Sequence, residues 1–160
     1  MTRAHILVRG MKDPLLDALF GLALDTRDHA VFGSAPLYMK GLKASLRDLD
    51  VIARGAAWAR ALELSGRGLL LPVEAAPSGR GRVVRHPSAP IEVFDEWPTA
   101  VDLDELIDGA EVIDGVPFVR VGDVLREKAR SGREKDRRDV ETARQRSYSA
   151  PLTTRATSPE

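Results

Sequence analysis

The chain has 160 residues, which is enough for one domain with a buried core. Lysine plus arginine and aspartate plus glutamate number 24 each, so no overall field favours a nucleic acid or an anionic membrane as partner. The absence of cysteine excludes disulfides, thiolate metal sites and a cysteine nucleophile, and the three scattered histidines argue against a histidine metal cluster.

The N-terminal half alternates short apolar segments with amphipathic ones. A short strand is expected at residues 4–8, and Asp13-Pro14 is typical of the N-cap and first turn of a helix running to about Leu24. The next expected elements are a strand at 29–32, a short helix at 36–41, a strand at 48–53 and a helix at 56–64.

The C-terminal half begins with expected strands at 69–73, 82–86 and 90–94. A short helix at 102–108 and a hairpin of 111–113 and 116–121, turning on Asp114-Gly115, follow. A helix is expected from Asp123, with a break near Ser131-Gly132 and a second helix at 134–146. The Ser/Thr/Pro-rich residues 147–160 have little to bury and are expected to form a disordered tail. Residues 1–146 are therefore predicted to form an α/β or α+β domain with a short mixed β-sheet flanked by helices.

Two carboxylates in one apolar strand carry the main functional signal. Successive strand side chains point to opposite faces, so Asp48 and Asp50 are expected on one face and Leu49 and Val51 on the other. Two like charges this close repel each other and are costly to remove from water. A divalent metal ion between them is the usual resolution.

A Gly-Ser turn precedes this acidic strand. Gly33 lets the backbone approach a phosphate closely, and the hydroxyl of Ser34 and nearby N–H groups can donate to phosphate oxygens. A helix beginning just after Ser34 would add the positive end of its dipole. If the turn and the acidic pair meet, Asp48 and Asp50 would hold one or two Mg²⁺ ions that bridge a triphosphate and activate an acceptor hydroxyl.

A third carboxylate usually completes such a site from an adjacent strand. Glu92, between Ile91 and Val93, is the candidate. Asp95 and Glu96 are the alternatives.

These motifs resemble the nucleotidyltransferase superfamily with the polymerase-beta-like fold. Its pattern of an apolar residue, Gly, Gly or Ser, a gap, and Asp-apolar-Asp-apolar is matched by residues 32–34 and 48–51, with a gap at the long end of the family's range. Residues 121–139, with Lys128, Lys135, Asp136 and Asp139, look like the K…R.KD..D segment of small bacterial nucleotidyltransferase-like proteins, including the abortive-infection toxin type.

The resemblance implies a metal-dependent transfer of a nucleoside monophosphate from a nucleoside triphosphate to an acceptor hydroxyl, with two Mg²⁺ ions. It assigns catalysis and metal binding to three carboxylates: Asp48, Asp50 and Glu92. It assigns nucleotide binding to Gly33, Ser34 and Lys128, of which Lys128 would contact phosphate or the base. Glu92 would be the third metal ligand or would help to deprotonate the acceptor.

Plainer explanations compete with each assignment. Gly33-Ser34 is also compatible with an ordinary turn, and Asp50 with an ion pair to Arg47 or Arg54. The charges of residues 128–139 also fit a salt-bridged helix face. Trp97 is expected to pack rather than to bind, and the arginines at 80, 82 and 85 fit a solvated loop better than a contact with an RNA acceptor.

The same resemblance indicates the kinds of partner to expect. The acceptor is a protein, an RNA or a small molecule, and a toxin or antitoxin partner fits the family. The alternative function is a catalytically inactive nucleotidyltransferase-fold module that binds or acts as an antitoxin. No secretory signal or membrane span is visible, so a cytoplasmic location and no membrane partner are expected.

Overall fold

The computed structural model describes residues 13–157, and the side chains of residues 13–146. The helices are α2 (Pro14–Gly21), α3 (Ala35–Met39), α4 (Gly55–Gly66), α5 (Leu103–Asp108), α6 (Val121–Ser131) and α7 (Glu134–Thr157). The strands are β1 (His29–Phe32), β2 (Leu49–Ala53), β3 (Glu74–Ala75), β4 (Arg82–Arg85), β5 (Ile91–Phe94), β6 (Glu111–Ile113) and β7 (Val116–Phe118).

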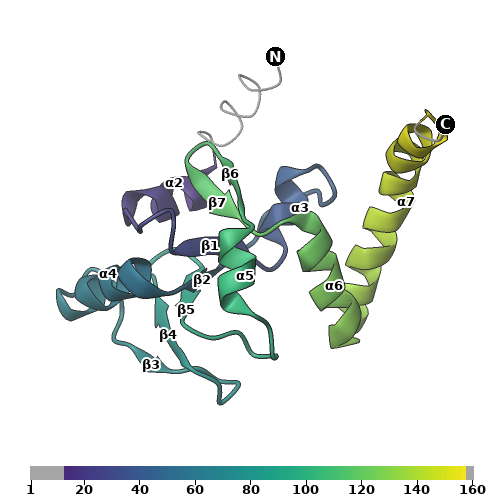
Figure 1. Ribbon diagram of the computed structural model, residues 1–160. Coiled ribbons are helices and arrows are strands. Elements are labelled where there is room, and N and C mark those ends of the chain that lie inside the picture. The colour runs from purple at the N-terminus through teal and green to yellow at the C-terminus, as the bar shows by residue number, and fades with distance from the viewer. Residues whose placement is uncertain (1–12, 158–160) are drawn as a thin grey trace.

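The strands form one mixed sheet in the order β3-β4-β5-β2-β1-β7-β6 (Figure 1). β1 runs antiparallel to β2 and parallel to β7, and β2 runs parallel to β5. The outer pairs β3–β4, β4–β5 and β6–β7 are antiparallel. The expected α/β fold with a mixed sheet flanked by helices is confirmed.

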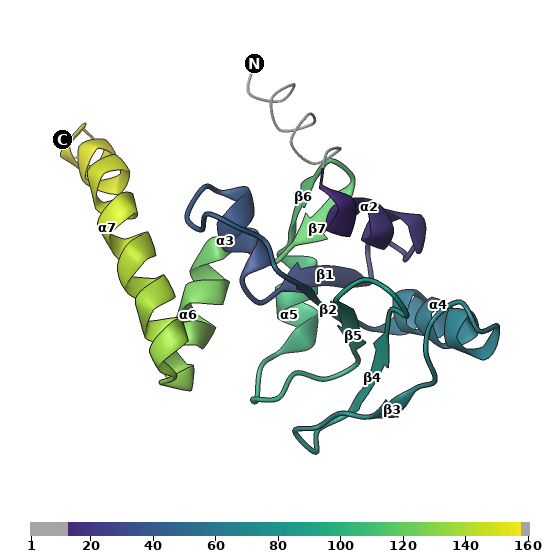
Figure 2. The ribbon, with the colours of Figure 1, turned by 180° about the vertical axis from the view of Figure 1, so that it is seen from behind.

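Helices cover both faces of the sheet, and the strand alternation decides which side chains each face receives (Figure 2). Leu49, Val51 and Ala53 of β2 pack in one core with α2 and α4. Ile52 points to the opposite face and packs with α5 and the start of α6. Asp50 shares that second face, as the period of two requires.

The hairpin between β6 and β7 has the turn chemistry that the sequence predicts. Asp114 and Gly115 both have positive φ, at 55° and 81°. Two positive φ angles define the two-residue turn whose twist matches antiparallel strands, and Asp-Gly is a favoured pair for it. The second strand ends at Phe118 rather than at 121, since α6 begins at Val121.

Two further expectations differ from the structure. Residues 69–73 form no strand: Leu70 is buried and Leu71 N–H donates to Arg85 C=O, but the short outer strand is β3, at residues 74–75. The expected tail from Ser147 is helical as far as Thr157 instead, because adding turns to an existing helix is easier than starting one. The strand expected at residues 4–8 lies outside the described residues.

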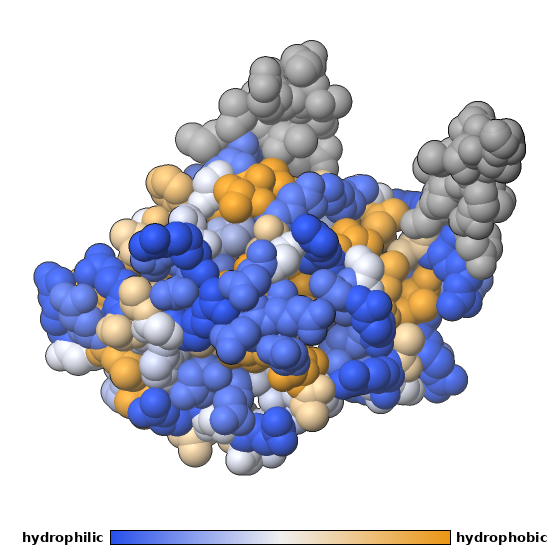
Figure 3. All heavy atoms as spheres, in the orientation of Figure 1, coloured by the Kyte–Doolittle hydropathy of each residue, from blue (hydrophilic) through white to orange (hydrophobic). Residues whose placement is uncertain are grey.

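Hydrophobic side chains on the face shown in Figure 3 appear in small groups within a mostly hydrophilic surface. Among the described residues, none of the helices combines the length and the apolar character that crossing a membrane would require.

Candidate functional site

One row of side chains crosses the middle of the sheet. Phe32 of β1 is in register with Asp50 of β2, Asp50 with Glu92 of β5, and Glu92 with Arg85 of β4. Directly opposed strand residues lie close enough for their side chains to interact. The parallel pairing of β2 with β5 therefore brings Asp50 and Glu92 together from positions far apart in the sequence.

A cavity of about 560 Å³ lies over this row, between the sheet and the α6–α7 pair. All six predicted site residues line it: Gly33, Ser34, Asp48, Asp50, Glu92 and Lys128. They come from the β1–α3 turn, the start of β2, β5 and α6. The structure thus brings together every residue that the sequence assigns to catalysis, metal binding or nucleotide binding.

The Gly33 turn touches the acidic strand directly. Gly33 has a φ of 66°, and a Cβ built there would lie 2.9 Å from Asp50 Oδ2. Any side chain would meet both the strained backbone conformation and this carboxylate. Glycine at position 33 is therefore needed for the turn to pass beside Asp50.

Burial and the neighbouring carboxylates raise the pKa of Asp50. Burial has the largest effect, and the negative charges of Asp48 and Glu92 add to it, against the opposing charges of Lys135 and Lys128. Together they raise the pKa of Asp50 to about 6. The site therefore favours any cation that can share these carboxylates.

Of the three candidates for the third carboxylate, only Glu92 lines the cavity. Asp95 instead accepts hydrogen bonds from the N–H and side chain of Arg82, and Glu96 is exposed. Glu92 is itself held by Arg85, whose Nε lies 2.6 Å from Glu92 Oε2. This ion pair with Arg85 is a structural role of Glu92 that competes with binding of a metal ion.

The carboxylates fit a hard divalent cation in donor chemistry, and only partly in arrangement. Asp48 is exposed and Asp50 half-buried, so both can offer oxygen ligands to Mg²⁺. Within residues 13–146, however, no three acidic or histidine side chains already enclose a position for a metal ion. One oxygen of Glu92, Oε2, is already paired with Arg85, so Glu92 would join Asp48 and Asp50 most readily after leaving Arg85.

Lys128 is the buried cation of the site. Its side chain is 8% exposed, and its three N–H groups have three acceptors: Ser34 Oγ at 3.0 Å, Asp136 Oδ1 at 3.0 Å and Asp139 Oδ2 at 3.1 Å. These charged side chains, Lys128, Asp136 and Asp139, therefore form a buried link between α6 and α7, rather than a solvated helix face. Direct contact of Lys128 with a phosphate would require one of these bonds to break.

The two acids that face Lys128 are stabilised as anions. Burial alone raises the pKa of Asp136, but hydrogen bonds from Ser131, Lys128 and Arg133 outweigh it and hold this pKa at about 2. Burial also opposes ionisation of Asp139, but Lys43 and Lys128 lower its pKa below the usual range.

Other cavity residues carried no clear signal in the sequence. Trp97 packs on Phe32, with ring centroids 4.6 Å apart, and also lines the cavity. Thr99 follows in the same loop and donates to Glu127 of α6. These positions lie in an irregular loop and on a helix face, where no periodic pattern or motif marks them.

Lys128→Met should strongly destabilise the fold, because it leaves Asp136 and Asp139 buried without their shared cation. The expected loss is about 3 kcal/mol or more in the free energy of unfolding, measured by urea denaturation at neutral pH. Lys135→Met is the matched control: Lys135 is exposed, and its replacement should change stability by less than about 0.5 kcal/mol. Equal effects of the two substitutions would contradict a structural role for Lys128.

Asp50→Asn should stabilise the protein at high pH but not at low pH. The folded pKa of Asp50 is raised from 3.8 to about 6, so the wild type loses stability as the pH rises from about 4 to about 6, and the loss is complete above that range. The variant should gain roughly 2 kcal/mol over the wild type at pH 8 and almost nothing below pH 4. Denaturation at both pH values measures this difference, and the exposed Asp17→Asn serves as the control. A gain independent of pH would contradict the assignment.

Compared with known proteins, the chain matches no family model and none of the curated proteins at a significant level.

Proposed function

We propose that this protein is a metal-dependent nucleotidyltransferase, which transfers a nucleoside monophosphate from a nucleoside triphosphate to an acceptor hydroxyl. One observation carries the proposal: the Gly-Ser turn, the two aspartates, Glu92 and Lys128 all line one cavity. Four chain segments meet there, and each supplies the residue type that this reaction needs. The volume of about 560 Å³ lies in the usual range of small-molecule sites.

The Gly-Ser turn would bind the triphosphate. Gly33 has no side chain to keep a phosphate from the backbone. Ser34 makes no capping bond to α3; its Oγ accepts from Lys128, which leaves the hydroxyl hydrogen to donate to a phosphate oxygen. Lys128 would act mainly by orienting Ser34 and by its positive charge.

Asp48 and Asp50, with Glu92 released from Arg85, would hold Mg²⁺. One or two such ions, when bound, would neutralise the charge that develops on the phosphates.

In the reaction, the acceptor oxygen forms a bond to the α-phosphorus, and the bond from the α-phosphorus to the bridging oxygen breaks. Pyrophosphate leaves, and the acceptor proton passes to a carboxylate of the site. Asp48, Asp50 and Glu92 all line the cavity, and Asp50 lies beside the Gly33 turn.

A second candidate is an inactive module of the same fold that only binds a partner. Two contacts favour it: the 2.6 Å pairing of Glu92 with Arg85, and the complete set of acceptors around Lys128. In both contacts, groups that catalysis would use are paired with other side chains of the protein.

Asp48→Asn should abolish transfer without affecting folding, since Asp48 is exposed and makes no hydrogen bond or ion pair within the described residues. The assay incubates α-labelled nucleoside triphosphates, Mg²⁺ and a cell extract, and follows labelled products. A loss on the order of a hundredfold or more is expected. Glu96→Gln, an exposed carboxylate outside the cavity, should retain full transfer. Full transfer by Asp48→Asn would rule out the metal-site assignment.

Arg85→Met should tighten binding of a divalent cation, because it frees the Glu92 carboxylate. Glu74→Gln should have the opposite effect, because Glu74 also accepts from Arg85, at 3.2 Å, and its loss leaves Arg85 to Glu92 alone. Changes of about two- to fivefold in the dissociation constant are expected for such partly exposed pairs. Electron paramagnetic resonance of Mn²⁺ measures it. If neither substitution shifts Mn²⁺ affinity, Glu92 is not a metal ligand.

A further inference from the structure

A second cavity, of about 310 Å³, adjoins the proposed active site and has the opposite charge. Ser34, Asp48 and Lys135 belong to the linings of both cavities. Its cations come from the loop before β2 and from α7: Lys43, Arg47, Lys135 and Arg138. Asp139 also lines the cavity, where it is paired with Lys43 at 3.0 Å. We call this cavity the basic cleft.

The balanced composition of the chain conceals this basic surface. Asp136 and Asp139 of α7 have side chains only 3% and 11% exposed, because both turn inward to Lys128. Lys128 pairs with both acids, and Lys43 pairs with Asp139 as well. The exposed surface of α7 therefore keeps most of the helix's cations and loses half of the acids present between residues 134 and 146.

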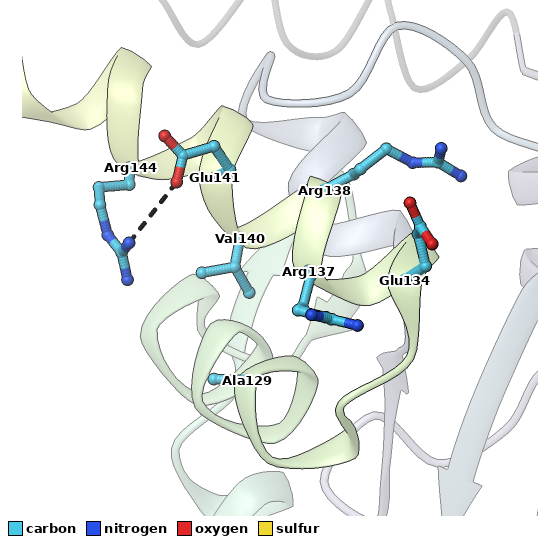
Figure 4. A pocket seen from close by; sticks show the side chains of 7 residues that line it. All are labelled: Ala129, Glu134, Arg137, Arg138, Val140, Glu141 and Arg144. Atoms are coloured by element: carbon cyan, nitrogen blue, oxygen red, sulfur yellow. Dashed lines mark ion pairs between the residues drawn. The ribbon is translucent and has the colours of Figure 1, made fainter.

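The basic surface continues along α7 beyond the cleft. A groove of about 510 Å³ between α6 and α7 is lined by three arginines, Arg137, Arg138 and Arg144, and by two acids, Glu134 and Glu141. Arg138 belongs to both the groove and the basic cleft. Figure 4 shows these arginines extending from α7, with Glu141 paired to Arg144. A path of cations therefore leads from this groove, through the basic cleft, to Asp48.

Four cations on this path are available for a ligand. Arg47, Lys135, Arg137 and Arg138 are exposed, and none of their side chains makes an ion pair or hydrogen bond within residues 13–146. The arginines at 80, 82 and 85 are different, since each is held internally: by Trp97 C=O, by Asp95 and by Glu92. The α7 path is thus better suited to a polyanion than that loop.

We propose that this path binds a single-stranded nucleic acid, whose end enters the basic cleft. Spaced cations along a narrow groove suit successive phosphates of one flexible strand. A membrane surface is flat and could not enter the cleft. The inference rests on the proposed function in one respect: a strand that ends at Asp48 would present its terminal hydroxyl as the acceptor. RNA and DNA share this chemistry.

Fluorescence anisotropy with labelled ten-nucleotide RNA and DNA strands, without triphosphate or Mg²⁺, tests the inference. The full chain should bind, and the logarithm of its affinity should fall linearly with that of the salt concentration. Arg47→Ala combined with Arg138→Ala should weaken binding about tenfold or more. The matched control, Arg27→Ala with Arg67→Ala, removes two exposed arginines around α4, at the opposite end of the molecule from α7, and should bind like the wild type. The ratio of RNA to DNA affinity identifies the preferred source.

Three results would overturn the inference: no saturable binding of either strand, equal weakening by the two double variants, or equally sensitive binding of phosphatidylserine vesicles. The assay separates this partner from the proposed chemistry, because it contains no triphosphate. Strand binding without transfer would count against the nucleotidyltransferase. Transfer to a small molecule without strand binding would count against this partner alone.

Discussion

The buried contact between Lys128 and its three acceptors determines how the second half of the chain meets the first. Lys128 lies on α6, Ser34 follows β1, and Asp136 and Asp139 lie on α7. A buried ammonium is costly unless all its donors are used, so this arrangement fixes one orientation of α7 against α6 and the turn. The cavity over the sheet exists because the two helices are held there.

The same contact separates the charges of the site. Asp136 and Asp139 are consumed by the buried cation, so α7 presents mainly its cations to solvent. The sheet contributes the opposite sign, because register places Asp50 beside Glu92. Negative and positive cavities meet at Asp48. A reaction between an anionic donor bound through metal ions and an anionic acceptor would use both, and burial, together with the charges of Asp48 and Glu92, raises the pKa of Asp50 on the acidic side.

Local rules predict a large part of this arrangement. Alternation along β2 places Asp50 opposite Leu49 and Val51, the Asp-Gly pair predicts the hairpin, and the Gly-Ser turn meets the acidic strand as expected. Contacts between residues that are far apart in the sequence cannot be predicted from these local rules. Nothing in the sequence of β4 indicates that Arg85 holds Glu92, and helical spacing alone does not tell whether Asp136 points outward or to Lys128. The strand predicted at residues 69–73 is wrong, because a run of apolar residues alone does not establish a strand.

Calorimetric titration with nucleoside triphosphates, in the presence and absence of Mg²⁺, tests the central claim most directly. If the Gly-Ser turn and the acidic pair form one site for a metal-bound triphosphate, binding should be saturable with Mg²⁺ and lost when the metal is removed by EDTA. The repulsion among Asp48, Asp50 and Glu92 predicts this dependence, since an anionic ligand alone would add to it. Absence of binding, or binding that ignores the metal, would contradict the account.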